Sequence, residues 1–132
     1  MSSQSQSKES LSHRPTRNEM KKAIRWFQKL MGIQDWEITL QYTDVMSEDI
    51  DIDQDKNMVI TGHCLACVRT KQAIVWISPT RVEQNDGDIY VALFHECYHV
   101  CLFDLEIENN ERIEFMVDRI SCLFSLLYQK II

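Results

Sequence analysis

The stretch His95-Glu96-Cys97-Tyr98-His99 decides most of what this sequence implies about fold and chemistry. It has the form HExxH and lies in a segment whose apolar residues recur with helical spacing. On a helix, residues four apart share a face, so His95 and His99 can bind one ion together. The carboxylate of Glu96 would then reach a water at that ion, which is the arrangement of zinc-dependent hydrolysis. Because such pentapeptides also occur by chance, the rest of the chain must support the site.

The composition of the 132-residue chain fits one globular domain, with 45% apolar and 26% charged residues. The formal net charge of −6 argues against nucleic acid or an anionic membrane as a partner. No apolar run is long enough to cross a membrane, and the N-terminus lacks the apolar core of a secretory signal. We therefore expect a cytoplasmic protein whose five cysteines are reduced thiols.

The N-terminal segment divides into a tail and a helix. Residues 1–15 are polar and rich in Ser and Gln, so we expect a flexible tail, followed by a single folded domain over residues 16–132. Thr16 and Glu19 form a capping-box pattern at the start of a helix. Apolar residues then repeat with helical spacing, and Gly32 is expected to end the helix.

The middle of the chain predicts a small sheet. Residues 36–42 alternate between apolar and polar side chains, as in a half-buried strand. Residues 44–57 are rich in carboxylates, and we expect an exposed loop there, with an irregular strand at its end. Residues 59–70 and 72–78 predict two more strands joined by a tight turn, and Pro79 ends the second.

Two helices complete the pattern. Residues 88–103 are helical, with Asn85, Asp86 or Asp88 as the possible cap, and residues 109–129 form the last helix. The order predicts an α+β fold with an N-terminal helix and a small, three- or four-stranded, mostly antiparallel sheet. The helix that carries HExxH and a C-terminal helix that carries glutamates follow the sheet.

A site with two His ligands needs a third protein ligand, and the last helix offers candidates. Its polar side chains lie on one arc and nearly everything else is apolar, so we expect a mostly buried helix whose polar stripe faces the site. The stripe consists of Glu111, Glu114, Asp118, Cys122, Ser125 and Gln129. Glu111 and Glu114 are both possible ligands, and Glu114 is favoured because only it has an aspartate, Asp118, four residues later.

HExxH followed by Glu-x-x-x-Asp on a second helix resembles the gluzincin branch of zinc metallopeptidases. The resemblance implies that His95, His99 and Glu114 bind one Zn²⁺ per chain. It implies that Glu96 is the general base and that Asp118 holds a ligand histidine. It also implies a minimal zincin fold, similar to the ImmA/IrrE-like metallopeptidase domains, and a peptide or protein substrate. The motif itself covers only these five residues.

The sequence leaves two questions about the site undecided: which residue stabilises the transition state, and whether the strand that contains Trp76 lies beside the cleft. Zincins commonly stabilise the transition state with a Tyr or His, and the sequence does not rank the candidates Tyr90, Tyr98, Tyr128 and His63. By resemblance, the strand that contains Trp76 is expected to lie beside the cleft and to pair with an extended substrate. An ordinary core strand is the alternative for that segment.

The leading hypothesis is a small cytoplasmic zinc metallopeptidase that hydrolyses a peptide bond through a water activated by Glu96. The alternative is a zincin-fold zinc-binding module for regulation or protein interaction, with little or no turnover. A third, weaker hypothesis is a regulatory protein that hydrolyses only the one target that it binds. The presence of Glu96 favours the enzyme, because metal binding alone does not need this carboxylate.

Overall fold

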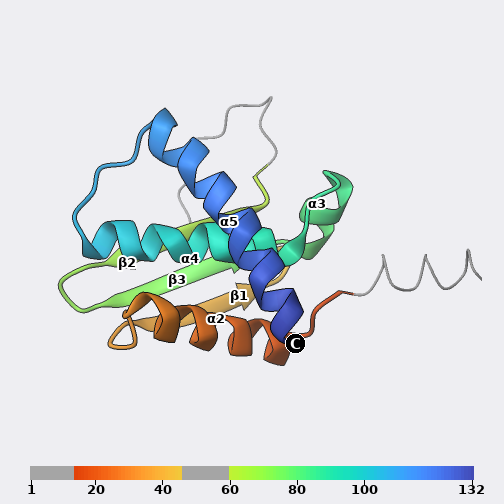
Figure 1. Cartoon of the computed structure of the whole chain (residues 1–132), viewed down its shortest axis with the longest axis horizontal. Helices are drawn as coiled ribbons and strands as arrows, with labels where there is room; N and C mark the ends of the chain where they lie inside the picture. The colour runs from red at the N-terminus through yellow and green to blue at the C-terminus, as the bar shows by residue number, and fades with distance from the viewer. Residues whose placement is uncertain (1–13, 46–59) are drawn as a thin grey trace, which may run out of the picture.

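The computed structural model describes residues 14–45 and 60–132 and has an α+β fold (Figure 1). The predictions for residues 1–13 and 46–59, which include most of the tail and of the acidic loop, lie outside the described residues. The last two residues of the predicted tail are described: Arg14 forms an ion pair with Glu83, and Pro15 is buried. No helix in the described ranges is both long and apolar enough to cross a membrane.

Helix α2 (Arg17–Met31) begins and ends where the sequence predicts. The Thr16 hydroxyl accepts a hydrogen bond from the Glu19 amide at 3.1 Å, and the Glu19 carboxylate accepts one from the Thr16 amide at 2.9 Å. Gly32 ends the helix with a φ of 71°, a left-handed conformation that a residue without Cβ adopts readily. The buried face of α2 consists of Met20, Ala23, Ile24 and Phe27.

Strands β1 (Glu37–Tyr42), β2 (Gly62–Cys67) and β3 (Gln72–Ile77) form a mixed sheet in the order β1-β3-β2. Strand β3 is parallel to β1 and antiparallel to β2. The prediction of a mostly antiparallel sheet is therefore wrong, because the β2–β3 hairpin inserts its second strand beside β1 and in the same direction. The central position of β3 explains why Val75, Trp76 and Ile77 are all buried, with no polar alternation.

A short helix, α3 (Pro79–Gln84), follows β3 and is absent from the prediction. The hydroxyl of Ser78 caps this helix by accepting a hydrogen bond from the Arg81 amide, and Pro79 occupies its first turn. Proline thus both ends the strand and starts the helix, since its fixed φ suits a first helical position.

Helix α4 (Ile89–Asp104), which carries HExxH, is the central layer of the fold (Figure 1). One side of α4 packs on β2 and β3, another on α2, and the side away from the sheet packs on α5 (Glu111–Ile131). Because α4 has neighbours on most sides, apolar residues occur nearly all round it. Asp88 caps the helix by accepting a hydrogen bond from the Val91 amide at 3.1 Å. The candidate site therefore rests on a rigid, buried element.

Helix α5 is less buried than the sequence predicts. Its buried face is narrow and consists of Val117, Ser121, Ser125 and Tyr128. The polar stripe lies toward α4 at Glu114 and Ser125, but much of the apolar surface of α5 is open in the structure. The exposed side chains are Phe115, Met116, Leu123, Leu126, Leu127 and Ile131. The expectation of a mostly buried helix is wrong because α5 packs on α4 along one narrow face, which leaves most of its apolar side chains exposed.

Candidate metal centre

The three side chains favoured as metal ligands converge between α4 and α5. The Nε2 atoms of His95 and His99 are 3.3 Å apart. The carboxylate of Glu114 places Oε2 3.1 Å from His95 Nε2 and Oε1 2.9 Å from His99 Nε2. Neighbouring ligand atoms of a tetrahedral zinc site, with bonds of about 2.0–2.1 Å, lie roughly 3.3 Å apart. These three atoms therefore have the spacing that a single ion of this kind requires.

Asp118 orients the first histidine. Its Oδ1 lies 2.8 Å from Nδ1 of His95, so the carboxylate can accept a hydrogen bond from a protonated Nδ1. In that tautomer the Nε2 atom of His95 carries a lone pair that faces His99 and Glu114. Two imidazole nitrogens and a carboxylate then converge on one point, and only a cation or shared protons relieve their repulsion. The chemistry of this donor set fits a divalent metal ion.

The environment of His99 also suits a metal ligand. Burial lowers the pKa of His99, and the nearby carboxylate of Glu114 offsets this effect in part. A lowered pKa keeps the imidazole neutral at neutral pH, which is the form that binds metal ions.

Glu114, and not Glu111, belongs to the cluster of possible ligands in the described part of the chain. Glu114 lies on the part of α5 that crosses α4, whereas Glu111 begins the helix and is exposed to solvent. The geometry therefore favours Glu114 over Glu111, which lies one helical turn earlier on α5.

Asn109 is a site residue that the sequence analysis missed. Its amide nitrogen donates a hydrogen bond of 2.9 Å to Oε1 of Glu114, the oxygen that faces His99. Asn109 precedes the helix cap Asn110, and no spacing rule connects it to HExxH. The Asn109 amide therefore helps to fix the orientation of the Glu114 carboxylate toward the histidines.

We expect the substitution Asn109→Ala to weaken zinc binding by about tenfold or more, because groups that orient metal ligands typically contribute 10–100-fold to affinity. Competition with a chromophoric chelator measures this change. Asn85→Ala is the matched control, since the Asn85 amide binds the Arg81 carbonyl in α3, away from the ligands. Equal zinc affinities for the two variants would contradict the role of Asn109.

Glu96 lies in the interior, between α4 and the sheet. A Cβ atom added to Gly62 of β2 would come within 3.2 Å of the Glu96 Cγ and 2.9 Å of the Trp76 carbonyl oxygen. Glycine at position 62 therefore makes room for the Glu96 side chain beside the sheet. Burial, and to a lesser extent the carboxylates of Glu114 and Asp118, raises the pKa of Glu96 to about 8.

This raised pKa predicts a pH-dependent stability of the metal-free protein. The pKa of an unperturbed Glu is 4.5, so the folded state holds the Glu96 proton more tightly than the unfolded chain does. The resulting stabilisation is present below the unfolded pKa of 4.5 and is lost as the pH rises toward about 8. We expect the free energy of unfolding of the wild type, relative to Glu96→Gln, to fall by a few kcal/mol over this range. Urea denaturation in the presence of a chelator measures it, and parallel pH profiles for the two proteins would refute the prediction.

The structure separates the four candidates for stabilising the transition state. Tyr90 and Tyr128 pack with Phe94, at ring-centroid distances of 6.3 and 5.7 Å, and with each other. Tyr98 also faces α5, where it packs against the ring of Phe124. Within the described residues, no hydrogen bond holds any of these three hydroxyls at the candidate ligands. The remaining candidate is His63 on β2, which lies close enough to His99 for its charge to contribute to the lowered pKa.

Trp76 does not lie in the position expected for a substrate-pairing strand. Strand β3 is hydrogen-bonded on both sides, so it cannot accept a further strand. The Trp76 side chain is fully buried, and its indole nitrogen donates a hydrogen bond of 2.9 Å to the Thr43 carbonyl. The strand with an unpaired edge near α4, within the described residues, is β2.

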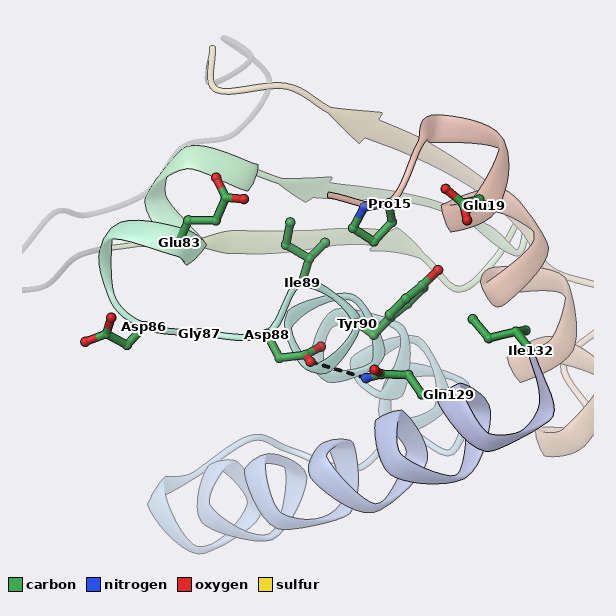
Figure 2. Close-up of a pocket in the computed structure, with 10 residues that line it drawn as sticks. All are labelled: Pro15, Glu19, Glu83, Asp86, Gly87, Asp88, Ile89, Tyr90, Gln129 and Ile132. Atoms are coloured by element: carbon green, nitrogen blue, oxygen red, sulfur yellow. Dashed lines mark hydrogen bonds between the residues drawn. The ribbon is translucent and has the colours of Figure 1, made fainter. Parts of the chain in front are cut away.

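A second feature fixes α5 against α4 at the end distant from the candidate ligands. A cavity of about 530 Å³ lies at the start of α4. Asp88 and Gln129 are on its wall, joined by a hydrogen bond (Figure 2). The Gln129 amide donates to Asp88 at 3.2 Å and the Ser125 hydroxyl does so at 3.3 Å. Other carboxylates of this cavity also have structural partners: Glu83 pairs with Arg14, and Glu19 caps α2. The hydrogen bonds to Asp88 thus hold α5 against the start of α4, which helps to place Glu114 opposite the histidines.

Comparison of the chain with protein-family models, with curated proteins and with solved structures gave no match. The function must therefore be argued from the chemistry of the site.

Proposed function

We propose that this protein is a zinc-dependent metallopeptidase of the gluzincin kind, with a minimal zincin-like fold. The observation that carries the proposal is the convergence of His95, His99 and Glu114 at distances of 2.9–3.3 Å. The hydrogen bond from His95 to Asp118 and the adjacent buried Glu96 complete the set of residues that the HExxH…ExxxD resemblance implies.

Zinc held by these three ligands would supply Lewis-acid chemistry, lowering the pKa of a water from about 15.7 to about 7. Glu96 would accept the proton of that water as it attacks the peptide carbonyl, and would then deliver it to the leaving amine. Without a metal, the raised pKa of about 8 keeps Glu96 mostly protonated at neutral pH. A divalent cation nearby would lower this pKa and favour the ionised carboxylate, which is the form that accepts a proton. His63 is the residue we favour for stabilising the developing oxyanion.

The substrate that suits this site is an extended peptide or a segment of a protein. Its backbone would pair with the free edge of β2, whose first residue, Gly62, lies against Glu96. The reaction would take place in the cytoplasm, where the free thiols of the five cysteines would stay reduced.

Two measurements test the proposal. Elemental analysis of protein purified without added metal is expected to give about one zinc per chain. A broad peptide library is then expected to be cleaved by the zinc-loaded wild type. Zinc binding without any cleavage would support the alternative, a zinc-binding regulatory or interaction module. The packing of Tyr90 against Tyr128 favours this alternative, because it engages two of the four candidates for stabilising the transition state. Absence of zinc binding would refute both functions.

A further inference from the structure

An apolar cavity of about 300 Å³ opens beside the candidate ligand His99. Its apolar walls come from three segments of the chain: Val68 in the β2–β3 turn, Leu102 and Phe103 at the end of α4, and Ile107 in the loop before α5. The volume is at the lower end of the range for small-molecule sites, roughly 300–1,000 Å³. A cavity of this size accepts one large apolar side chain.

The wall formed by the α4–α5 loop is held in place by backbone hydrogen bonds. The Ile107 amide donates to the Leu102 carbonyl at 2.9 Å, and the Glu106 amide donates to the Phe103 carbonyl at 3.0 Å. Glu106 adopts a left-handed conformation, with a φ of 57°, which reverses the chain at the end of α4. The position of this cavity wall is therefore fixed by the backbone of the loop.

Several contacts join this cavity to the candidate metal centre. His99 lines it directly, and Asn109 lines it while donating a hydrogen bond to Glu114. Val68 follows the last residue of β2, so a peptide that pairs with the edge of β2 runs toward the cavity. An occupant of the cavity would thus lie beside His99, one of the three candidate ligands, and beside Asn109, which binds Glu114. It would also lie at the end of the β2 edge.

The charged and apolar groups of the cavity determine which substrate side chains it binds poorly. Glu106 and Glu108 lie at its rim and are exposed. Their negative charge disfavours acidic residues, while the apolar walls disfavour small polar ones.

We propose that this cavity binds an apolar side chain of the peptide substrate, of the size of Leu, Met or Phe, beside the scissile bond. The proposal rests on the proposed peptidase function. It adds that Val68, Phe103 and Ile107 determine the substrate preference of the site.

Binding of two capped peptides to the full-length chain tests the proposal without requiring turnover. The probes are N-acetyl-Ala-Leu-Ala amide and N-acetyl-Ala-Gly-Ala amide, titrated into methyl-labelled protein with and without zinc and followed by NMR. We expect the leucine peptide to bind about tenfold or more tightly, because its isobutyl group leaves water for an apolar cavity. The methyl signals of Val68, Leu102 and Ile107 are expected to shift with the leucine peptide and not with the glycine peptide.

Three variants make the test specific. Val68→Trp narrows the cavity at an exposed turn, and Ile107→Ala removes part of its wall; both are expected to reduce the preference for leucine several-fold. Val45→Trp is the matched control, since Val45 is exposed and is not part of the cavity. Equal binding of the two peptides, or an unchanged preference in both cavity variants, would overturn the proposal.

The same data separate this proposal from the peptidase function. Leucine-selective binding at the cavity without any cleavage would support the cavity and argue against the enzyme. Zinc-dependent cleavage with no preference for apolar residues on either side of the scissile bond would overturn the cavity proposal alone.

Discussion

Glu96→Gln is expected to lower kcat/KM for peptide cleavage by about 10²–10⁴-fold, the usual contribution of a general acid–base group. Glutamine has nearly the same shape as glutamate but cannot take a proton from water. The variant is expected to keep about one zinc per chain, because Glu96 is not among the clustered ligand atoms. Cleavage of a fluorogenic peptide, with zinc content measured on the same samples, gives both quantities.

Glu37→Gln is the matched control, because it removes the charge of an exposed glutamate on β1. It is expected to leave both zinc content and cleavage unchanged. Cleavage by Glu96→Gln at the wild-type rate would show that another group activates the water, or that the cleavage comes from a contaminating peptidase. Loss of zinc in this variant would instead mean that Glu96 supports the ligands, and would contradict the expected retention of one zinc per chain.

Features that depend on neighbouring residues in the chain could be predicted from the sequence. Thr16, Glu19 and Gly32 determine the ends of α2 through local hydrogen bonds and backbone conformation, and the structure confirms all three. The juxtaposition of His95 and His99 follows in the same way from the repeat of the helix.

Features that depend on packing between distant segments could not be predicted in this way. The sequence does not specify that β3 inserts between β1 and β2, because strand order depends on how the chain returns after β1. The position of Asn109 against Glu114 depends on the path of the α4–α5 loop.

The candidates for transition-state stabilisation illustrate the same limit. Tyr90 and Tyr128 have suitable chemistry, but their rings complete an aromatic cluster around Phe94. The large apolar ring of tyrosine makes burial in such a cluster favourable. Whether a given tyrosine lies in the cluster or at the site is seen only in the three-dimensional arrangement. His63 could not be ranked above them, because its approach to His99 depends on how β2 packs against α4.

Glu114→Ala is expected to reduce zinc affinity by more than about 100-fold, exceeding the 10–100-fold that is typical for groups behind the ligands. Glu114 supplies the only carboxylate of the candidate ligand set in the described residues, and its two oxygens face both histidines. Removing it leaves two neutral imidazoles, which bind a divalent cation without any compensating charge. Competition with a chromophoric chelator gives the affinity, and circular dichroism verifies that the variant folds.

Glu111→Ala is the decisive control for this experiment, because it removes the same side chain one turn earlier on α5. Glu111 is exposed and outside the ligand cluster, so its loss is expected to change zinc affinity less than about twofold, within the small effect of one screened surface charge. The reverse result, with Glu111→Ala losing zinc and Glu114→Ala retaining it, would require α5 to be shifted by about one turn along its axis, so that Glu111 takes the position of Glu114. Such a shift would also remove Asp118 from the site, since Asp118 reaches His95 in the same helix position that places Glu114 beside the two histidines.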